Sequence, residues 1–140
     1  MKKDKKLLFI DTSAFISLYD MDDVNHDKSV KFFTPENLGN INFIPFTTNF
    51  VFDEVYAYFC RRHDDAIKIG TFIRESKILK FIRIDENDEE EAWMLAKKYN
   101  DKTFSFTDCT SFVAMKKYHA QCAFTYDKHF TQMGFKSYPE

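Results

Sequence analysis

The chain has 140 residues, of which 44% are hydrophobic and seventeen are Phe, and this suits one globular domain with an aromatic core. Its net charge of −2 gives no overall attraction to nucleic acid, so any RNA or DNA contact must come from local basic groups. No apolar run approaches the roughly 20 residues of a membrane helix, and the start is too poor in apolar residues for a signal peptide, so we expect a soluble cytoplasmic protein.

Hydrophobic patterning and turn residues predict strands that alternate with helices along the whole chain. In chain order we predict a strand at 7–10, helices at 12–20 and 24–34, an extended stretch at 42–46, a helix from Thr47 or Thr48 to about Arg62, a helix at 64–76, a strand at 78–84, helices at 85–99 and 105–118, a strand at 120–126, a short helix at 127–133 and an irregular end.

This alternation predicts an α/β fold in which helices cover a parallel sheet, and a single domain over residues 1–140. In the stretch at 42–46, Pro45 favours the edge of the sheet or the end of a strand, because proline donates no hydrogen bond.

Cysteine and glycine usage excludes several kinds of site. The cysteines Cys60, Cys109 and Cys122 are odd in number and form no C-x-x-C pair, which favours reduced thiols over a zinc site or a disulfide framework. The chain lacks the glycine-rich loops of P-loop and classical dinucleotide sites.

Two aspartates directly follow predicted strands, at the edge of a parallel sheet where sites usually form. Asp11 follows the run LLFI, and Asp127 follows AFTY. Each taken alone suits the N-cap of the next helix better than a ligand.

Two further acids suit the same edge. Asp108 completes the capping-box pattern S-x-x-D with Ser105, and in the first helical turn its carboxylate can still point into a site. Glu54 has only apolar or aromatic neighbours one helical turn away, where a carboxylate is costly unless something satisfies it. Asp53, next to it, suits a solvated position.

Four carboxylates at one edge repel each other, and a hard divalent cation such as Mg²⁺ or Mn²⁺ relieves that repulsion. Such a site suits phosphodiester hydrolysis. Histidine is not needed, and none falls at a strand-end position beside these acids. His129 and His119 can reach the site, but a role as general base is disfavoured for both, because metal-bound water needs no histidine. A phosphatase with Asp11 as nucleophile is disfavoured too, because DTSAF lacks a second Asp two residues on.

The order of these motifs resembles the PIN domain, and within it the VapC-like toxin ribonucleases. The motifs are FIDTSAF, the mid-chain DEVYAYF, SFTDCTSFVAM, and FTYDKHF with its trailing F..MGF. The resemblance implies a three-layer α/β/α sandwich with a central parallel sheet, and Mg²⁺- or Mn²⁺-dependent endoribonuclease activity. It also implies a homodimer that a cognate antitoxin protein holds inactive.

The resemblance assigns roles residue by residue. Asp11 and Asp108 match the principal metal ligands, Glu54 matches the acid that completes the metal shell, and Asp127 matches a fourth acid. The supporting or phosphate-contacting residues that it implies are the hydroxyl pairs Thr12 with Ser13 and Ser105 with Thr107.

Phosphate contacts with RNA need basic side chains, of which Lys128, beside Asp127, is the best placed. Besides Lys128, the other basic residues that could contact RNA phosphates are Lys2, Lys3, Lys5, Lys6, Arg61, Arg62, Lys116 and Lys117. Tyr126 and Phe130 suit either base stacking or core packing.

Two other functions stay open: a housekeeping PIN nuclease that processes RNA, and a non-catalytic nucleic-acid-binding module whose acids are only helix caps.

Overall fold

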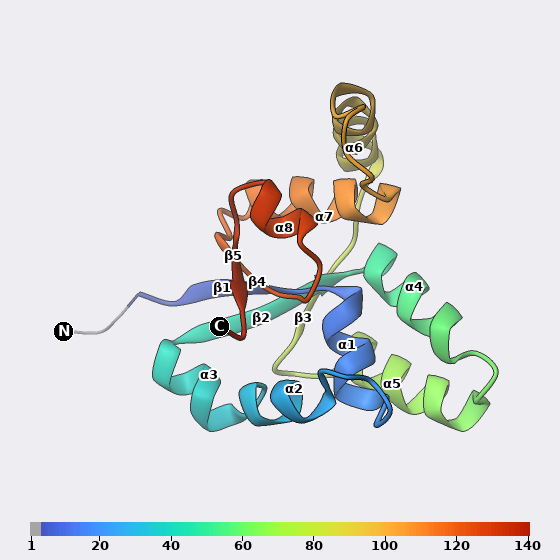
Figure 1. Ribbon diagram of the computed structural model, residues 1–140, viewed down its shortest axis with the longest axis vertical. Helices are drawn as coiled ribbons and strands as arrows, with labels where there is room; N and C mark the ends of the chain where they lie inside the picture. The colour runs from blue at the N-terminus through green and yellow to red at the C-terminus, as the bar shows by residue number, and fades with distance from the viewer. Residues whose placement is uncertain (1–3) are drawn as a thin grey trace.

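The computed structural model describes residues 4–140 and has a five-stranded sheet with helices on both faces (Figure 1). The elements of the described chain are β1 (Lys6–Ile10), α1 (Thr12–Tyr19), α2 (His26–Phe32), α3 (Pro35–Ile41), β2 (Phe43–Thr48), α4 (Asn49–Phe59), α5 (His63–Glu75), β3 (Lys80–Ile82), α6 (Glu86–Lys98), α7 (Phe106–Lys117), β4 (Cys122–Phe124), α8 (His129–Gln132) and β5 (Lys136–Tyr138).

All strand pairs of the described sheet are parallel, in the order β3-β2-β1-β4-β5. The central strand β1 pairs with β4 so that Ile10 lies opposite Phe124. The chain therefore leaves both strands at the same level of the same edge. Asp11 N donates to the Phe124 carbonyl oxygen (3.1 Å), which fixes the start of the β1–α1 turn against β4.

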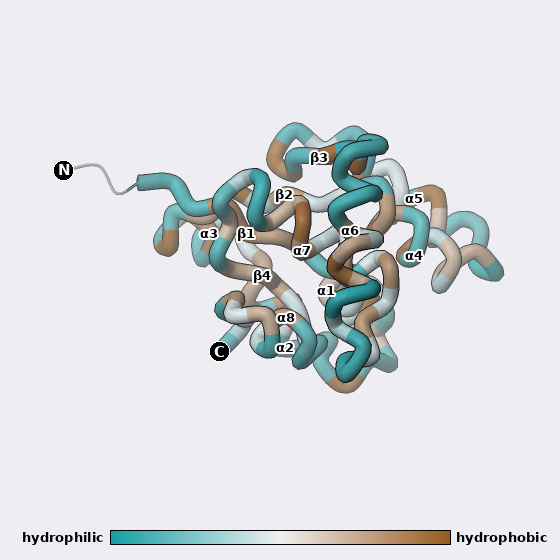
Figure 2. Tube along the Cα trace, turned by 90° about the horizontal axis from the view of Figure 1, so that it is seen from above, coloured by the Kyte–Doolittle hydropathy of each residue, from teal (hydrophilic) through white to brown (hydrophobic). Residues whose placement is uncertain are grey.

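The layers confirm the predicted α/β/α sandwich. In Figure 1, α7 and α8 lie above the strands, and α1, α2, α3 and α5 lie below them. Figure 2 shows hydrophobic segments gathered in the middle of the molecule, along β1, β4 and α7. Burial of the same strands, on both faces of the sheet, explains why β1 reads as a continuous apolar run.

Phenylalanine rings join the sheet to the helices on both faces. Phe9 of β1 packs against Phe46 of β2 (ring centroids 5.3 Å apart) and Phe130 of α8 (5.8 Å). On β4, Phe124 packs against Phe32 at the end of α2 (5.0 Å). All four of the sheet and α8 rings, those of Phe9, Phe46, Phe124 and Phe130, are fully or almost fully buried.

Three features differ from the sequence-based predictions. Residues Pro35–Ile41 form the extra helix α3, in which Pro35 occupies the first turn, where its missing N–H costs nothing. The irregular end contains β5. Pro45 lies on the internal strand β2, so the edge prediction was wrong; β3 pairs with β2 only from Phe46 onward, which leaves Pro45 beyond the reach of β3.

Among the helices of residues 4–140, none has the length and apolar character needed to cross a membrane.

Replacement of Phe9 by Ala should lower the free energy of unfolding by about 3–5 kcal/mol, because it removes a fully buried ring that contacts two others. The measurement is urea denaturation. Val24→Ala is the control: Val24 is 94% exposed, and its truncation should change stability by less than about 0.5 kcal/mol. Equal effects of the two variants would contradict this description of the core.

Candidate functional site

A polar cleft of about 340 Å³ opens at the edge where β1 and β4 end. It is bounded by the first turns of α1 and α7, by α4, and by the segment that leads into α8. The four acids singled out from the sequence all line it. Its lining residues are Asp11, Thr12, Ser13, Ile16, Glu54, Thr103, Ser105, Asp108, Asp127 and His129.

Asp11 occupies the N-cap position of α1, but its side chain makes no capping hydrogen bond. Its Oδ2 instead accepts hydrogen bonds from Thr125 Oγ1 (2.8 Å) and Ser13 Oγ (3.0 Å). The side chain is buried, with the residue only 4% exposed. The capping interpretation therefore explains the position of Asp11 in the chain but not the direction of its carboxylate.

The pKa of Asp11 is raised from 3.8 to about 7, chiefly by burial and in smaller part by the nearby charge of Asp108. The hydrogen bonds from Thr125 and Ser13 work in the opposite direction, because they stabilise the ionised form. The ionised carboxylate is thus held in a place that disfavours its charge. A cation beside the carboxylate would favour the ionised form instead.

Asp108 is held by the capping box of α7. Ser105 Oγ accepts from Asp108 N (3.0 Å), and Asp108 Oδ2 accepts from Ser105 N (3.0 Å), as the S-x-x-D pattern predicts. Asp108 is buried, and burial raises its pKa, an effect that the hydrogen bonds from Ser105 and His129 oppose. Asp108 therefore takes part in the cap of α7 and also presents its carboxylate to the cleft.

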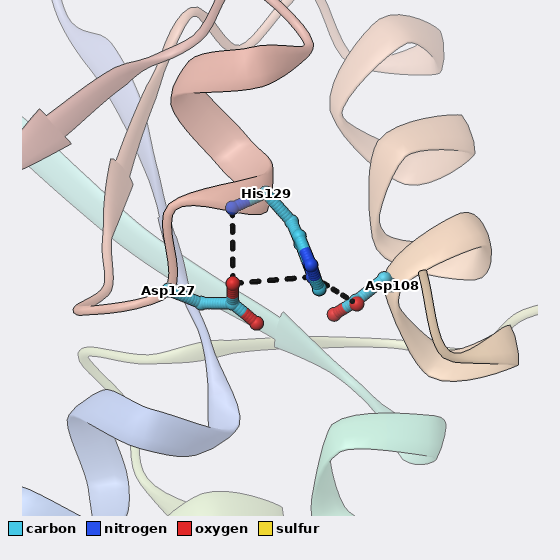
Figure 3. Close-up of side chains that lie close together, drawn as sticks. All are labelled: Asp108, Asp127 and His129. Carbon is cyan, nitrogen blue, oxygen red and sulfur yellow. Dashed lines mark hydrogen bonds and ion pairs between the residues drawn. The ribbon is translucent and has the colours of Figure 1, made fainter. Parts of the chain in front are cut away.

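His129 lies between two of the acids, in the site that its position in the sequence allows it to reach. Its Nδ1 is 3.0 Å from Asp108 Oδ2 and 3.2 Å from Asp127 Oδ1, and Figure 3 shows the three side chains pointing toward one another. An ionised carboxylate only accepts hydrogen bonds, so Nδ1 is the donor. The opposite ring nitrogen, Nε2, is 3.2 Å from Thr103 Oγ1.

Asp127 is positioned by the turn that leads from β4 into α8. Its backbone N–H donates to Thr125 Oγ1 (3.0 Å), and its Oδ1 accepts from the backbone N–H of His129 (2.9 Å). One ligand atom each from Asp108, Asp127 and His129 can be chosen so that all three lie within 4.8 Å of one another, close enough to share a metal ion. Among the described residues, Asp11 and Glu54 lie outside this tightest group but line the same cleft.

Glu54 reaches the cleft from α4, and its Oε1 accepts from Thr12 Oγ1 (2.7 Å). It is partly buried, whereas Asp53 is exposed. The structure therefore places Glu54, and not its neighbour, in the cleft, as the helical pattern predicted.

The supporting residues divide into two groups. Thr12, Ser13 and Ser105 line the cleft, whereas Thr107 and Lys128 are not among its lining residues. Lys128 is exposed at the start of α8, so its predicted phosphate contact requires substrate to extend beyond the cleft. Lys2 and Lys3 lie outside the described residues.

The sequence analysis missed two residues of the site, Thr103 and Thr125. Thr125 is two residues before Asp127, a spacing at which a hydroxyl can accept from a backbone N–H, and this local signal could have identified it. The contact of Thr125 with Asp11 spans 114 residues and needed the fold. Phe130 packs in the core, so its ring is not free for the base stacking considered above. Tyr126 is half-buried, and its hydroxyl bonds Ser29 Oγ (2.5 Å).

The model of the PIN domain family matches residues 8–136. The chain is 28% identical over 131 residues to the 23S rRNA-specific endonuclease VapC20 of Mycobacterium tuberculosis, with 92% of this chain and 95% of that protein covered.

Solved structures show the same fold. The crystal structure of Mycobacterium tuberculosis VapC20, described as a sarcin-ricin loop cleaving toxin, matches with a TM-score of 0.81 and 27% identity over 91% of this chain and 95% of that one. A toxin–antitoxin complex from Klebsiella pneumoniae matches with a TM-score of 0.60 and 12% identity over 86% and 87% of the two chains. The crystal structure of FitAcB from Neisseria gonorrhoeae matches with a TM-score of 0.63 and 10% identity, over 94% of this chain and 96% of that one.

Replacement of Asp11 by Asn should stabilise the protein in EDTA at pH 8, by up to about 4 kcal/mol, because it removes a buried charge. The folded-state pKa of about 7 lies above the usual 3.8, so this carboxyl lowers wild-type stability progressively as the pH rises from about 4 to about 7, and the loss is complete above that range. The measurement is the free energy of unfolding of both proteins from pH 4 to pH 8.

Asp53→Asn is the matched control for this prediction, since Asp53 is the exposed acid next to Glu54. Its stability should follow that of the wild type at every pH. If Asp11→Asn is no more stable than wild type at pH 8, the carboxylate is not held in the environment described above.

Proposed function

Because the chain belongs to the PIN domain family, we propose that it is an endoribonuclease that uses Mg²⁺ or Mn²⁺ to hydrolyse RNA phosphodiester bonds, as the toxin of a type II toxin–antitoxin pair. The observation that carries the proposal is the convergence of Asp11, Glu54, Asp108 and Asp127 on one cleft, in a chain similar to a 23S rRNA-specific endonuclease.

The donor set of the cleft suits a hard divalent cation. Four carboxylates supply oxygen ligands, which Mg²⁺ and Mn²⁺ prefer. Burial chiefly, and a neighbouring acid in smaller part, raise the pKa of Asp11 and Asp108, so a cation bound there would favour their ionised forms. The residues present therefore fit the ion that the family implies.

The chain itself arranges the ligands. Asp11 and Asp108 are the principal ligands, the first fixed by Thr125 and Ser13 and the second by the capping box of α7. Glu54 is held by Thr12, and Asp127 by the turn into α8. Because each acid is restrained by a hydrogen bond, little reorganisation is needed before the ion binds.

A bound ion would supply an activated water and would neutralise charge on the scissile phosphate. The residues around the ion accept a proton, hold the ligands in place and contact the phosphate. Glu54, on the α4 side of the cleft, can accept the proton of an attacking water. His129 holds Asp108 and Asp127 at one spacing, and Ser105 offers a hydroxyl at the mouth of the cleft where a phosphate would lie.

The partners follow from the same family membership. We propose an RNA substrate, a cognate antitoxin that covers the acidic cleft, a homodimer and a cytoplasmic location. The antitoxin is supported by the fold shared with a toxin–antitoxin complex.

The direct test is cleavage of labelled RNA with Mn²⁺ or Mg²⁺. Wild type should cut and EDTA should abolish cutting, and Asp11→Asn and Glu54→Gln should each lower the rate by at least about a hundredfold, because each removes a charged ligand. Asp53→Asn should cut at the wild-type rate. Cleavage that survives EDTA, or an Asp11→Asn variant as fast as wild type, would exclude this mechanism.

The toxin assignment has a separate test. Expression of the chain alone should halt growth of a host cell, and Asp108→Asn should relieve the arrest. Co-expression of the gene directly upstream should restore growth, and its product should co-purify with this chain. Growth unaffected by an active wild-type nuclease would favour a housekeeping role in RNA processing.

A further inference from the structure

Phe106 is the most exposed phenylalanine of the chain. All seventeen Phe residues lie in the described part of the chain, where Phe106 is 39% exposed and the others are buried or partly buried. The core buries phenyl rings on both faces of the sheet, so lack of space in the core does not explain why Phe106 is exposed. A single exposed apolar residue carries little weight by itself; its location is what matters.

Phe106 is the first residue of α7, between two residues of the cleft. Ser105 before it and Asp108 after it both line the cleft, and they are joined by the two hydrogen bonds of the capping box. The capping box fixes the backbone on both sides of Phe106. The ring therefore projects from a rigid point beside the acidic cleft.

Phe50 supports the ring of Phe106 from α4. The two rings meet edge to face, with centroids 6.1 Å apart and planes at 68°. Such a contact covers at most one face of Phe106, so at least one face stays free of Phe50. Phe50 precedes Glu54 by four residues, one helical turn of about 6 Å, so the aromatic pair runs alongside the acids.

We propose that Phe106, supported by Phe50, stacks on an unpaired base of the RNA next to the bond that is cut, an inference that rests on the function proposed above. The acids of the cleft repel phosphates, so a substrate gains little from charge there until a cation is bound. Stacking on a phenyl ring supplies binding free energy that does not depend on charge, and every base has a face for it.

The proposal restricts the class of substrate. A base inside a duplex has both faces covered by its neighbours, whereas a base in a loop or a single strand can turn outward onto an aromatic side chain. The stacked base must therefore be unpaired, as bases of a loop such as the one that VapC20 is described as cleaving can be, and the stacked position tolerates any base identity. Phe106 is a substrate-contacting residue under this proposal, and Phe50 is a positioning residue.

The test is an abasic scan of a single-stranded RNA, read out by affinity and by KM and kcat separately. For wild type, one abasic position should weaken binding about tenfold, within the range that stacking gives on alanine substitution. Phe106→Leu, which keeps an apolar side chain without a ring, should bind the intact RNA about tenfold more weakly, with kcat little changed. An RNA with the same abasic position should then bind this variant no more weakly than the intact RNA does.

Two variants serve as controls. Phe106→Tyr keeps the ring and should retain wild-type affinity. Trp93→Leu removes an exposed ring (53% exposed) from α6 and should leave RNA affinity unchanged. In a Trp93→Phe background, Phe106→Trp provides a single tryptophan whose fluorescence single-stranded RNA should quench and a fully paired duplex should not.

Failure of this inference can be told from failure of the proposed function. If wild type cuts RNA but Phe106→Leu binds and cuts equally well, the stacking proposal is wrong and the nuclease stands. If Phe106→Leu keeps RNA affinity but loses self-association or antitoxin binding, the ring belongs to a protein interface, and the proposal is again wrong. If wild type binds and cuts only fully paired RNA, the stacking proposal is wrong and the nuclease stands; if it neither binds nor cuts any RNA, both proposals fail.

Discussion

The site depends on the burial of one carboxylate at the end of the central strand. Asp11 can lie there because Thr125 and Ser13 donate to it, and both donors are supplied by chain segments that start or end at the same edge of the sheet. Even with those bonds, burial and the charge of Asp108 make the ionised form costly. The remainder of the cleft gathers more acids around this residue, which makes sense for a protein that completes its site with a cation.

The aromatic core makes that arrangement rigid. Phe9 of β1 and Phe112 of α7 both pack against Phe130 of α8, and the same three elements carry or adjoin Asp11, Asp108 and Asp127. Movement of any one carboxylate would therefore require movement of packed rings. Interiors of this density resist such displacement, so the hydrophobic core contributes to the spacing of the acids as well as to stability.

Several residues serve two purposes at once. Asp108 caps α7 and presents its carboxylate to the cleft, and Ser13 both donates to Asp11 and accepts from Tyr126 N. Such overlap explains why local rules of sequence gave ambiguous answers at these positions. A capping motif and a ligand are distinguished only by what else the carboxylate meets.

All strands of the described sheet except β5, most of the helices and the four acids could be predicted from the sequence, because apolar runs, capping boxes and apolar helix faces are local signals. The pattern also separated Glu54 from Asp53, since their neighbours one turn away differ. The tertiary structure alone decided which groups meet across long separations: Thr125 with Asp11, His129 with Asp108, and Phe106 with Phe50. Sequence periodicity fixes the face of an element on which a residue lies, whereas the partner on the other side of a cleft is set by how the elements pack.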